Sequence, residues 1–177
     1  MSLSEHLILL ADYNAAMNQR MYEAAVQLPV EELLADRRAF FGSILGTLNH
    51  LVAGDTIWLQ RFARHPAGFA SLAPLRAMPA PTALTQMQFY ELDHWHPHRI
   101  ELDTIIQAWA REVREDDLAH VLEYTNTRGV VARKRMASLV LHFFNHQTHH
   151  RGQTTTMLSQ AGIAFGITDL LASIPDE

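Results

Sequence analysis

Two histidines near the end of the chain, His146 and His150, have the spacing that a metal site on a helix needs. Residues four apart lie on one face of a helix, so two imidazoles placed there can bind a single ion. The other positions of the same stripe are Leu139, Phe143, Gln153, Met157 and Ala161. Because these positions favour a core and a buried polar group without a partner costs roughly 1–3 kcal/mol, a shared metal ion is an economical partner for the histidines.

A third ligand is expected from another helix, because a catalytic zinc site usually takes three protein ligands and leaves one position to water. We select His50, which lies between Leu48 and Leu51 in an apolar helical pattern and can turn toward the bundle axis. A lone histidine on a helix is more often a core or surface residue, so the assignment of His50 as a ligand depends on the presence of the His146 and His150 pair. Imidazole suits several divalent ions; zinc or nickel is expected first, with iron or copper as alternatives.

The remaining histidines have plainer interpretations. His142 and His149 share a neighbouring stripe with Ser138, Asn145, Gly152 and Thr156, which is typical of a polar or interface face. His94, His96 and His98 surround Pro97 and are expected at a solvated kink, with a surface metal site as the alternative.

Several other kinds of site are excluded by what the sequence lacks. With no cysteine there are no disulfides, thiolate nucleophiles or iron–sulfur ligands. A di-iron carboxylate bundle needs two Glu-x-x-His motifs, and we find one, from Glu91 to His94. The sequence has no His-Glu-x-x-His, P-loop, dinucleotide-binding glycine pattern or nucleophile elbow. A histidine-only site is what remains.

The composition is that of an ordinary globular protein, with 48% hydrophobic and 19% charged residues among 177. The formal charge is −5 and the only basic cluster is Arg133-Lys134-Arg135, so we expect no nucleic-acid partner. No basic segment opens the chain, and no apolar run approaches the roughly 18 residues that span a bilayer. We therefore expect a cytoplasmic protein with no membrane partner.

Hydrophobic periodicity predicts four long helices that would position these histidines. We expect them at Leu3 to Leu28, from an N-cap at Ser43 to about Arg64, at Thr82 to Glu115 with a break at Pro97, and at Met136 to Gln160. A long crossover is expected between Pro66 and Thr82, a β-hairpin between His120 and Arg135, and a short helical turn at Ile167 to Ala172. The prediction is one domain, residues 1–177, forming an all-α four-helix bundle with a small hairpin before the last long helix.

The segment Asn145-His146-Gln147-Thr148-His149-His150-Arg151-Gly152-Gln153 resembles the His-x-x-x-His-Arg-Gly-Gln signature of the DinB/YfiT-like metalloenzyme family. Leu48-Asn49-His50-Leu51, followed by Asp55 and Trp58, is similar to the family's helix-2 pattern, and Tyr13-Asn14 with Asn18 is a weaker third match. The resemblance implies up-up-down-down connectivity, a metal between the second and fourth long helices, and a homodimer.

The family includes transferases and isomerases that act with the low-molecular-weight thiols bacillithiol, mycothiol or glutathione, although many members have no established activity. The resemblance therefore implies a metal-dependent enzyme with a small-molecule substrate, with thiol S-transfer as the first hypothesis. The alternatives are a metal-dependent hydrolase, a metal- or ligand-binding stress-response protein without turnover, and a structural bundle. Asp55 and Gln153 are expected to orient ligand imidazoles, or Asp55 to make a local polar contact, and Arg151 to form a salt bridge inside the bundle or to bind an anionic substrate.

Overall fold

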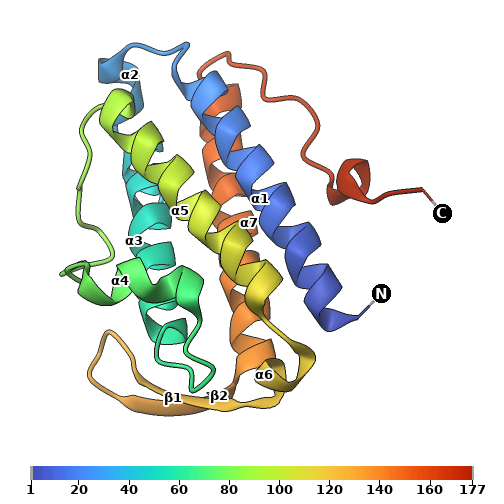
Figure 1. Ribbon diagram of the computed structural model, residues 1–177. Coiled ribbons are helices and arrows are strands. Elements are labelled where there is room, and N and C mark those ends of the chain that lie inside the picture. The colour runs from blue at the N-terminus through green and yellow to red at the C-terminus, as the bar shows by residue number, and fades with distance from the viewer. Residues whose placement is uncertain (1, 177) are drawn as a thin grey trace.

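The computed structural model describes residues 2–176, whose four long helices form a bundle (Figure 1). The long helices are α1 (Leu3–Ala25), α3 (Ile44–Phe62), α5 (Leu92–Glu112) and α7 (Met136–Gln160). The shorter elements are α2 (Val30–Leu34), α4 (Ala73–Ala77), α6 (Glu115–Ala119), β1 (Val121–Thr125), β2 (Val131–Arg135) and the 3₁₀ turns Ala70–Leu72 and Leu170–Ser173. The prediction of an all-α bundle with a small hairpin before the last helix is confirmed.

The long helices run up, down, down and up in chain order, as Figure 1 shows. Ser4 at the start of α1 donates a hydrogen bond to Glu115 just beyond the end of α5, so α1 and α5 are antiparallel. Early residues of α3 and α5 meet where Trp95 donates to the Leu48 carbonyl, so these two helices are parallel. The up-up-down-down order that the resemblance implies is therefore corrected. The reason is that the long crossover joins α3 to α5, whereas a shorter connection through α2 returns the chain from α1 to α3.

Local signals fix the ends of the helices. Ser43 caps α3 by accepting a hydrogen bond of 3.0 Å from the Gly46 amide, which confirms the predicted N-cap. Helix α7 occupies the predicted residues and follows β2 directly. Gly162, with φ of +83°, turns the chain beyond its end, where a glycine avoids the strain of the left-handed conformation.

The start of the third long helix was predicted too early, because 82–91 form a loop and α5 begins only at Leu92. The side chain of Asn49 explains this difference: it accepts hydrogen bonds from the amides of Gln88 and Phe89 and donates one to the Phe89 carbonyl. These contacts replace the bonds that a helix would have made. Pro97 does not end α5, since a proline near the start of a helix removes a single intrahelical hydrogen bond.

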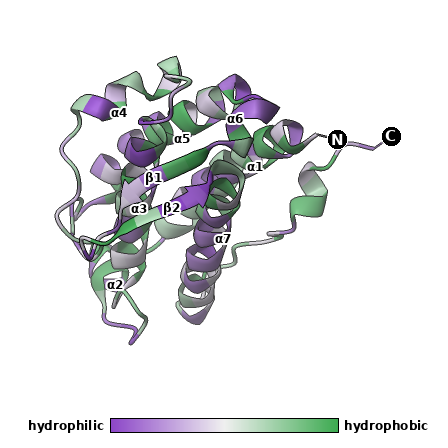
Figure 2. Cartoon of the chain, turned by 90° about the horizontal axis from the view of Figure 1, so that it is seen from below, coloured by the Kyte–Doolittle hydropathy of each residue, from purple (hydrophilic) through white to green (hydrophobic). Residues whose placement is uncertain are grey.

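Aromatic rings fill the end of the bundle that the hairpin covers. Phe62 stacks on Trp109 with ring centroids 5.0 Å apart and meets the edge of Phe143 at 5.8 Å. Tyr124 on β1 packs against Trp58 of α3 at 5.4 Å. Figure 2 shows the hairpin crossing this end, with β2 in the colour of hydrophilic residues, and four of the five β2 residues are exposed. The hairpin thus closes the core next to the beginning of α7.

Two short elements differ from the sequence prediction. Helix α2 lies between the first two predicted long helices, where no element was predicted, and the expected final helical turn is a 3₁₀ turn at Leu170–Ser173. The chain leading to that turn packs along α1, where Arg20 donates to the carbonyls of Phe165 and Ile167. Among the helices of residues 2–176, none has the length and apolar character needed to cross a membrane.

Candidate metal centre

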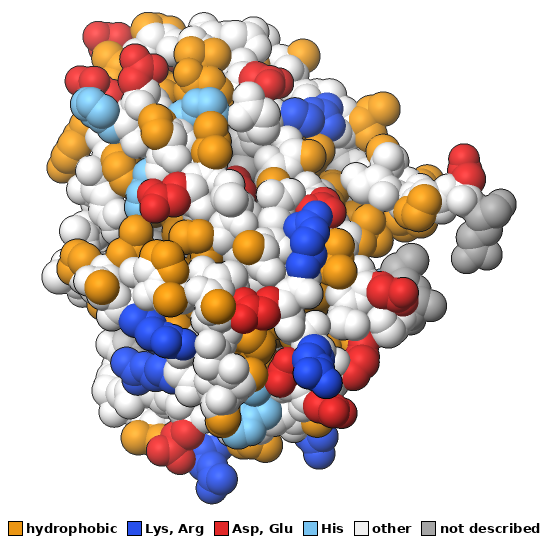
Figure 3. All heavy atoms as spheres, in the orientation of Figure 1, with side chains coloured by type: hydrophobic (Ala, Val, Ile, Leu, Met, Phe, Trp, Pro, Cys, Tyr) orange, Lys and Arg blue, Asp and Glu red, His pale blue; other side chains and the backbone are white. Residues whose placement is uncertain are grey.

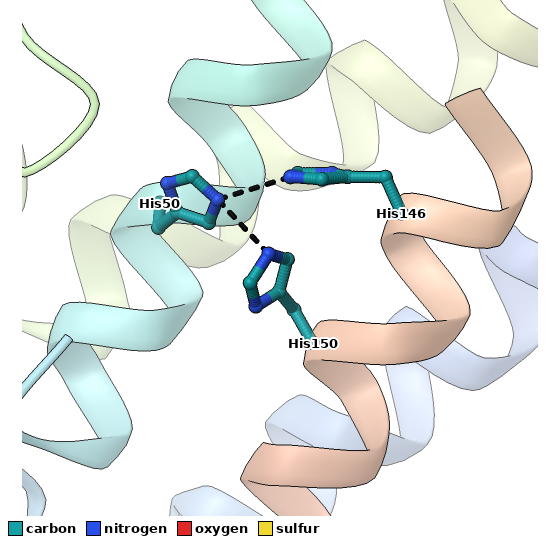
Figure 4. Close-up of side chains that lie close together, drawn as sticks. All are labelled: His50, His146 and His150. Carbon is teal, nitrogen blue, oxygen red and sulfur yellow. Dashed lines mark hydrogen bonds between the residues drawn. The ribbon is translucent and has the colours of Figure 1, made fainter. Parts of the chain in front are cut away.

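The three histidines selected from the sequence come together between α3 and α7 (Figure 4). The Nε2 atom of His50 lies 3.0 Å from Nε2 of His146 and 3.1 Å from Nε2 of His150. His146 and His150 stand on successive turns of α7, and His50 faces them from the middle of α3. A nitrogen of each ring lies within 4.8 Å of the other two, so the group could hold a metal ion.

Hydrogen bonds on the far side of two rings fix which nitrogen carries the proton. Nδ1 of His50 lies 2.9 Å from the Leu84 carbonyl, which can only accept, so this Nδ1 is protonated. Nδ1 of His150 lies 2.9 Å from Oε1 of Gln153 and is protonated for the same reason. The expectation that Gln153 orients a ligand imidazole agrees with this contact. Both neutral rings therefore present a lone pair at Nε2.

This arrangement suits a bound cation. The Nε2 atoms of His50 and His150, 3.1 Å apart, are both acceptors and cannot form a hydrogen bond with each other when the rings are neutral. Metal–nitrogen distances of about 2.0–2.1 Å place two ligand nitrogens of one ion about 3–3.4 Å apart. The spacing observed at His50 is therefore close to that of a shared coordination sphere, and the all-imidazole donor set is one that zinc, nickel, copper and iron accept.

Burial keeps the candidate ligands neutral. Only 2% of His50 and 7% of His150 is exposed, and His146 is partly buried. Burial lowers the pKa of His50 to about 4. It also lowers the pKa of His146 to about 3, with the neighbouring imidazoles adding to the effect. At neutral pH these nitrogens are available to a metal without first losing a proton.

Two residues that form the walls of the site were not selected from the sequence. Phe41 stacks on His50 with ring centroids 3.7 Å apart and meets the edge of His150 at 5.4 Å. Gly54 faces His146 so closely that a Cβ at this position would lie 2.9 Å from Cε1 of the ring. An isolated glycine inside a helical pattern is a signal of close approach and could have indicated Gly54. Phe41 lies in a connection, where periodicity gives no signal.

Asn49 holds the loop that supplies the carbonyl partner of His50. Its side chain binds the backbone of Gln88 and Phe89 at 2.8 Å, and the same loop carries Leu84. In the sequence analysis, Asn49 was part of the match to the family's helix-2 pattern, but no role was predicted for it. Because the loop was predicted as helix, its contact with His50 was not foreseen.

A buried network of charges lies behind the metal-facing residues. Asp55 accepts hydrogen bonds from Arg99 at 2.6 Å and from Gln147 at 2.9 Å. Of the two roles considered for Asp55, these contacts match the local polar one rather than orientation of an imidazole. Burial raises the pKa of Asp55, and the Arg99 guanidinium opposes that shift.

Arg151 lies in the same interior. Its Nη1 donates to Asn14 at 3.1 Å and its Nη2 to Thr148 at 3.2 Å, and the guanidinium lies 4.9 Å from the centroid of the Tyr13 ring. No carboxylate of residues 2–176 comes within salt-bridge distance of Arg151, so the expected salt bridge is replaced by neutral hydrogen bonds. With 4% of the residue exposed, Arg151 is part of the interior.

The other histidines lie outside the ligand group. His96 stacks on Tyr22 with centroids 3.6 Å apart, His98 packs on Phe89, and His94 is exposed beside Glu91. The structure thus separates the three histidines around Pro97. His142 rests against Trp58, and Nε2 of His149 contacts the Gln153 amide, so both border the metal-facing residues.

Comparison with known proteins gives a consistent result. The DinB family model matches residues 1–176. Protein DinB of Bacillus subtilis (strain 168) is 26% identical over 171 residues, which cover 94% of this chain and 92% of that protein. No solved structure matches the chain. Because the family match extends over almost the whole sequence, the chain belongs to the DinB family.

Proposed function

We propose that this chain binds one divalent metal ion through His50, His146 and His150 and works as a metal-dependent enzyme. The observation that carries the proposal is the 3.1 Å approach of two unprotonated Nε2 atoms, from His50 and His150, inside the bundle. Neutral rings would repel each other in this arrangement, whereas an ion bound between them is attracted to both. Zinc or nickel is proposed, and iron or copper accepts the same ligands.

Three protein ligands leave coordination positions for water or substrate. The bound ion would supply a Lewis acid that lowers the pKa of a water or thiol. The residues of the chain hold the rings in place: the Leu84 carbonyl orients His50 and Gln153 orients His150. Phe41 shields the His50 and His150 rings from water on one side.

The proposed reaction is transfer of a low-molecular-weight thiol to a small electrophilic substrate. In it, the thiol gives its proton to water, its sulfur forms a bond to the electrophilic carbon, and the leaving group departs with the electron pair of the broken bond. The charge of the ligand set supports this proposal. Three neutral imidazoles leave the positive charge of the ion uncompensated, which favours an anionic thiolate.

Elemental analysis of untagged protein tests the metal site. We expect one equivalent of metal in the wild type and its loss in His50→Ala, His146→Ala and His150→Ala. His94→Ala is the matched control, because this exposed histidine lies away from the group. A wild-type protein that takes up no divalent metal, and whose thermal stability is the same with and without chelator, would contradict the proposal.

Turnover is tested by mixing metal-loaded protein with a thiol and an electrophile and identifying the product by mass spectrometry. A thioether product that disappears in His146→Ala supports S-transfer. A product formed with water identifies a hydrolase, and tight binding without any product identifies a binding protein. The homodimer and the cytoplasmic location remain predictions. Sedimentation analysis would test whether the protein is a dimer.

A further inference from the structure

A hollow opens beside His146, and Phe41 is not among the residues that line it. It has a volume of about 260 Å³, and its walls include Gly54, Trp58, Leu84 and His146. The Leu84 carbonyl is the partner of His50, so this hollow adjoins the candidate metal centre from the loop side. A molecule bound here would have one end next to the proposed ligands.

The hollow continues along α3 toward α4. A second hollow of about 230 Å³ shares Ile57, Arg61 and the hairpin turn with the first, and a third of about 380 Å³ shares Gln60 and Arg64 with the second. We call the three neighbouring hollows together the α3 groove; its walls are formed by residues from 54–64, 75–84 and 124–127. Their succession along α3 suits an extended molecule.

Three arginines line the α3 groove: Arg61 borders the first and second hollows, Arg64 the second and third, and Arg76 the third. No carboxylate of residues 2–176 lies within 4.0 Å of any of them, although the chain as a whole has a formal charge of −5. Figure 3 shows basic side chains gathered at the left of the face that it draws. Such a group of uncompensated guanidinium charges attracts anions.

Arg61 is held in place for binding. Its guanidinium lies 4.5 Å from the centroid of Trp58 and 4.8 Å from that of Tyr124, and one nitrogen donates to the Thr125 carbonyl at 3.3 Å. A guanidinium has five N–H donors, so others remain for a ligand. Since a helix rises 1.5 Å per residue, the backbone of Arg61 lies about 10 Å along the axis from Gly54, which faces His146.

We infer that the α3 groove binds an extended anionic substrate, whose carboxylate or phosphate group pairs with Arg61 and Arg64 and whose opposite end lies beside His146. Guanidinium groups bind both oxyanions in the same bidentate geometry. The aromatic walls formed by Trp58 and Tyr124 suit an apolar segment between the two ends. The identity of the reacting end rests on the proposed function, whereas the anion site at the arginines does not.

Binding to metal-free protein tests the anion site alone. We would titrate chelator-treated protein with phenyl phosphate and with phenylacetate, and measure dissociation constants by calorimetry. Saturable binding of at least one probe is expected, and the tighter probe identifies the oxyanion. Arg61→Gln and Arg64→Gln are each expected to weaken that binding about tenfold. Arg133→Gln, an exposed arginine on β2, is the matched control and should leave it unchanged.

The outcomes separate this inference from the proposed function. If neither probe binds, or if all three variants weaken binding equally, the anion site is wrong even when the protein holds metal. If His146→Ala binds the probe normally while the wild type takes up no metal, the proposed function fails and the anion site stands. Should Arg61→Gln not fold, Arg64→Gln carries the test, because its exposed side chain lies beyond the end of α3.

A second measurement tests the position of the reacting end. For metal-loaded protein, we expect the affinity for a series of unbranched ω-mercapto carboxylates to pass through a maximum at one chain length. The maximum should disappear in Arg61→Gln. An affinity that does not depend on chain length would show that the two ends are not recognised together.

Discussion

Gln147 on α7 donates a hydrogen bond of 2.9 Å to Asp55 on α3, so a buried contact ties together the two helices that carry the candidate ligands. Asp55 also accepts from Arg99 at 2.6 Å, and Arg99 pairs with Asp103 on the same helix. Asn18 of α1 then donates to Asp103 at 2.9 Å. All four long helices thus meet in one polar network behind the metal-facing residues.

Asp55→Ala is expected to destabilise the protein by about 3 kcal/mol, because removing one partner of a buried ion pair leaves a charge poorly compensated. Urea unfolding in the presence of chelator measures this change without a contribution from metal. Asp12→Ala is the control, since the ion pair between Asp12 and Arg111 is about half exposed and should contribute below about 1 kcal/mol. Equal losses in the two variants would show that burial of the network has no energetic importance.

Gly54→Ala is expected to weaken metal binding about tenfold, because the new Cβ would lie 2.9 Å from Cε1 of His146 and push the ring aside. Competition with a chelator of known affinity measures the change. Gly152→Ala on α7 is the matched control, since its Cβ would meet no atom within 4 Å. That control should gain up to about 1 kcal/mol of stability from helix propensity and keep its metal affinity.

Asn49→Ala is expected to release the 82–91 loop and with it the Leu84 carbonyl that orients His50. Loss of such an orienting contact lowers metal affinity about 10- to 100-fold. Amide hydrogen exchange at Gln88 and Phe89 should become faster in the same variant. Gln60→Ala, which loses comparable contacts with the backbone of Leu75 and Met78, should leave metal affinity unaltered. Unchanged amide hydrogen exchange at Gln88 would show that the Asn49 side chain does not hold the loop in place.

The metal-free protein is expected to lose stability as the pH falls below about 6.5. In the unfolded chain the imidazoles of His50 and His146 take up protons near that pH, whereas burial lowers their folded pKa values to about 4 and about 3. The unfolded state therefore binds more protons, and the free energy of unfolding decreases toward acid. Thermal unfolding in chelator at pH 7, 6 and 5 measures the trend. His146→Gln should show a shallower decrease, and an identical decrease would contradict this explanation.

The parts of the fold that follow local rules were predictable from the sequence. The bounds of α7, the cap at Ser43 and the hairpin all depend on neighbouring residues, and the structure has them where they were expected. The approach of His50 to the α7 histidines could be anticipated because apolar neighbours turned each histidine toward the core. The choice of His50 also drew on the resemblance to the family's helix-2 pattern, because a lone histidine on a helix is more often a core or surface residue.

The surroundings of the histidines depend on contacts between residues that are distant in the sequence, and these contacts were not predicted. The 82–91 segment has helical periodicity. The Asn49 side chain, however, binds the backbone amides of Gln88 and Phe89, which lie 39 and 40 residues further along the chain. Phe41 and Leu84 reach the site from connecting segments, where no period predicts a position. The direction of α3 was also misjudged, because the up-up-down-down order was taken from the resemblance and no residue pattern in the sequence shows which helices run parallel.

His50 and His146 are separated by 96 positions in the sequence, and the fold alone makes them neighbours. During synthesis, the first histidine leaves the ribosome long before the second exists, so no nascent fragment ending before α7 can present the complete ligand set. Capture of an ion by the proposed ligands would therefore have to wait until α7 has been made and lies against α3.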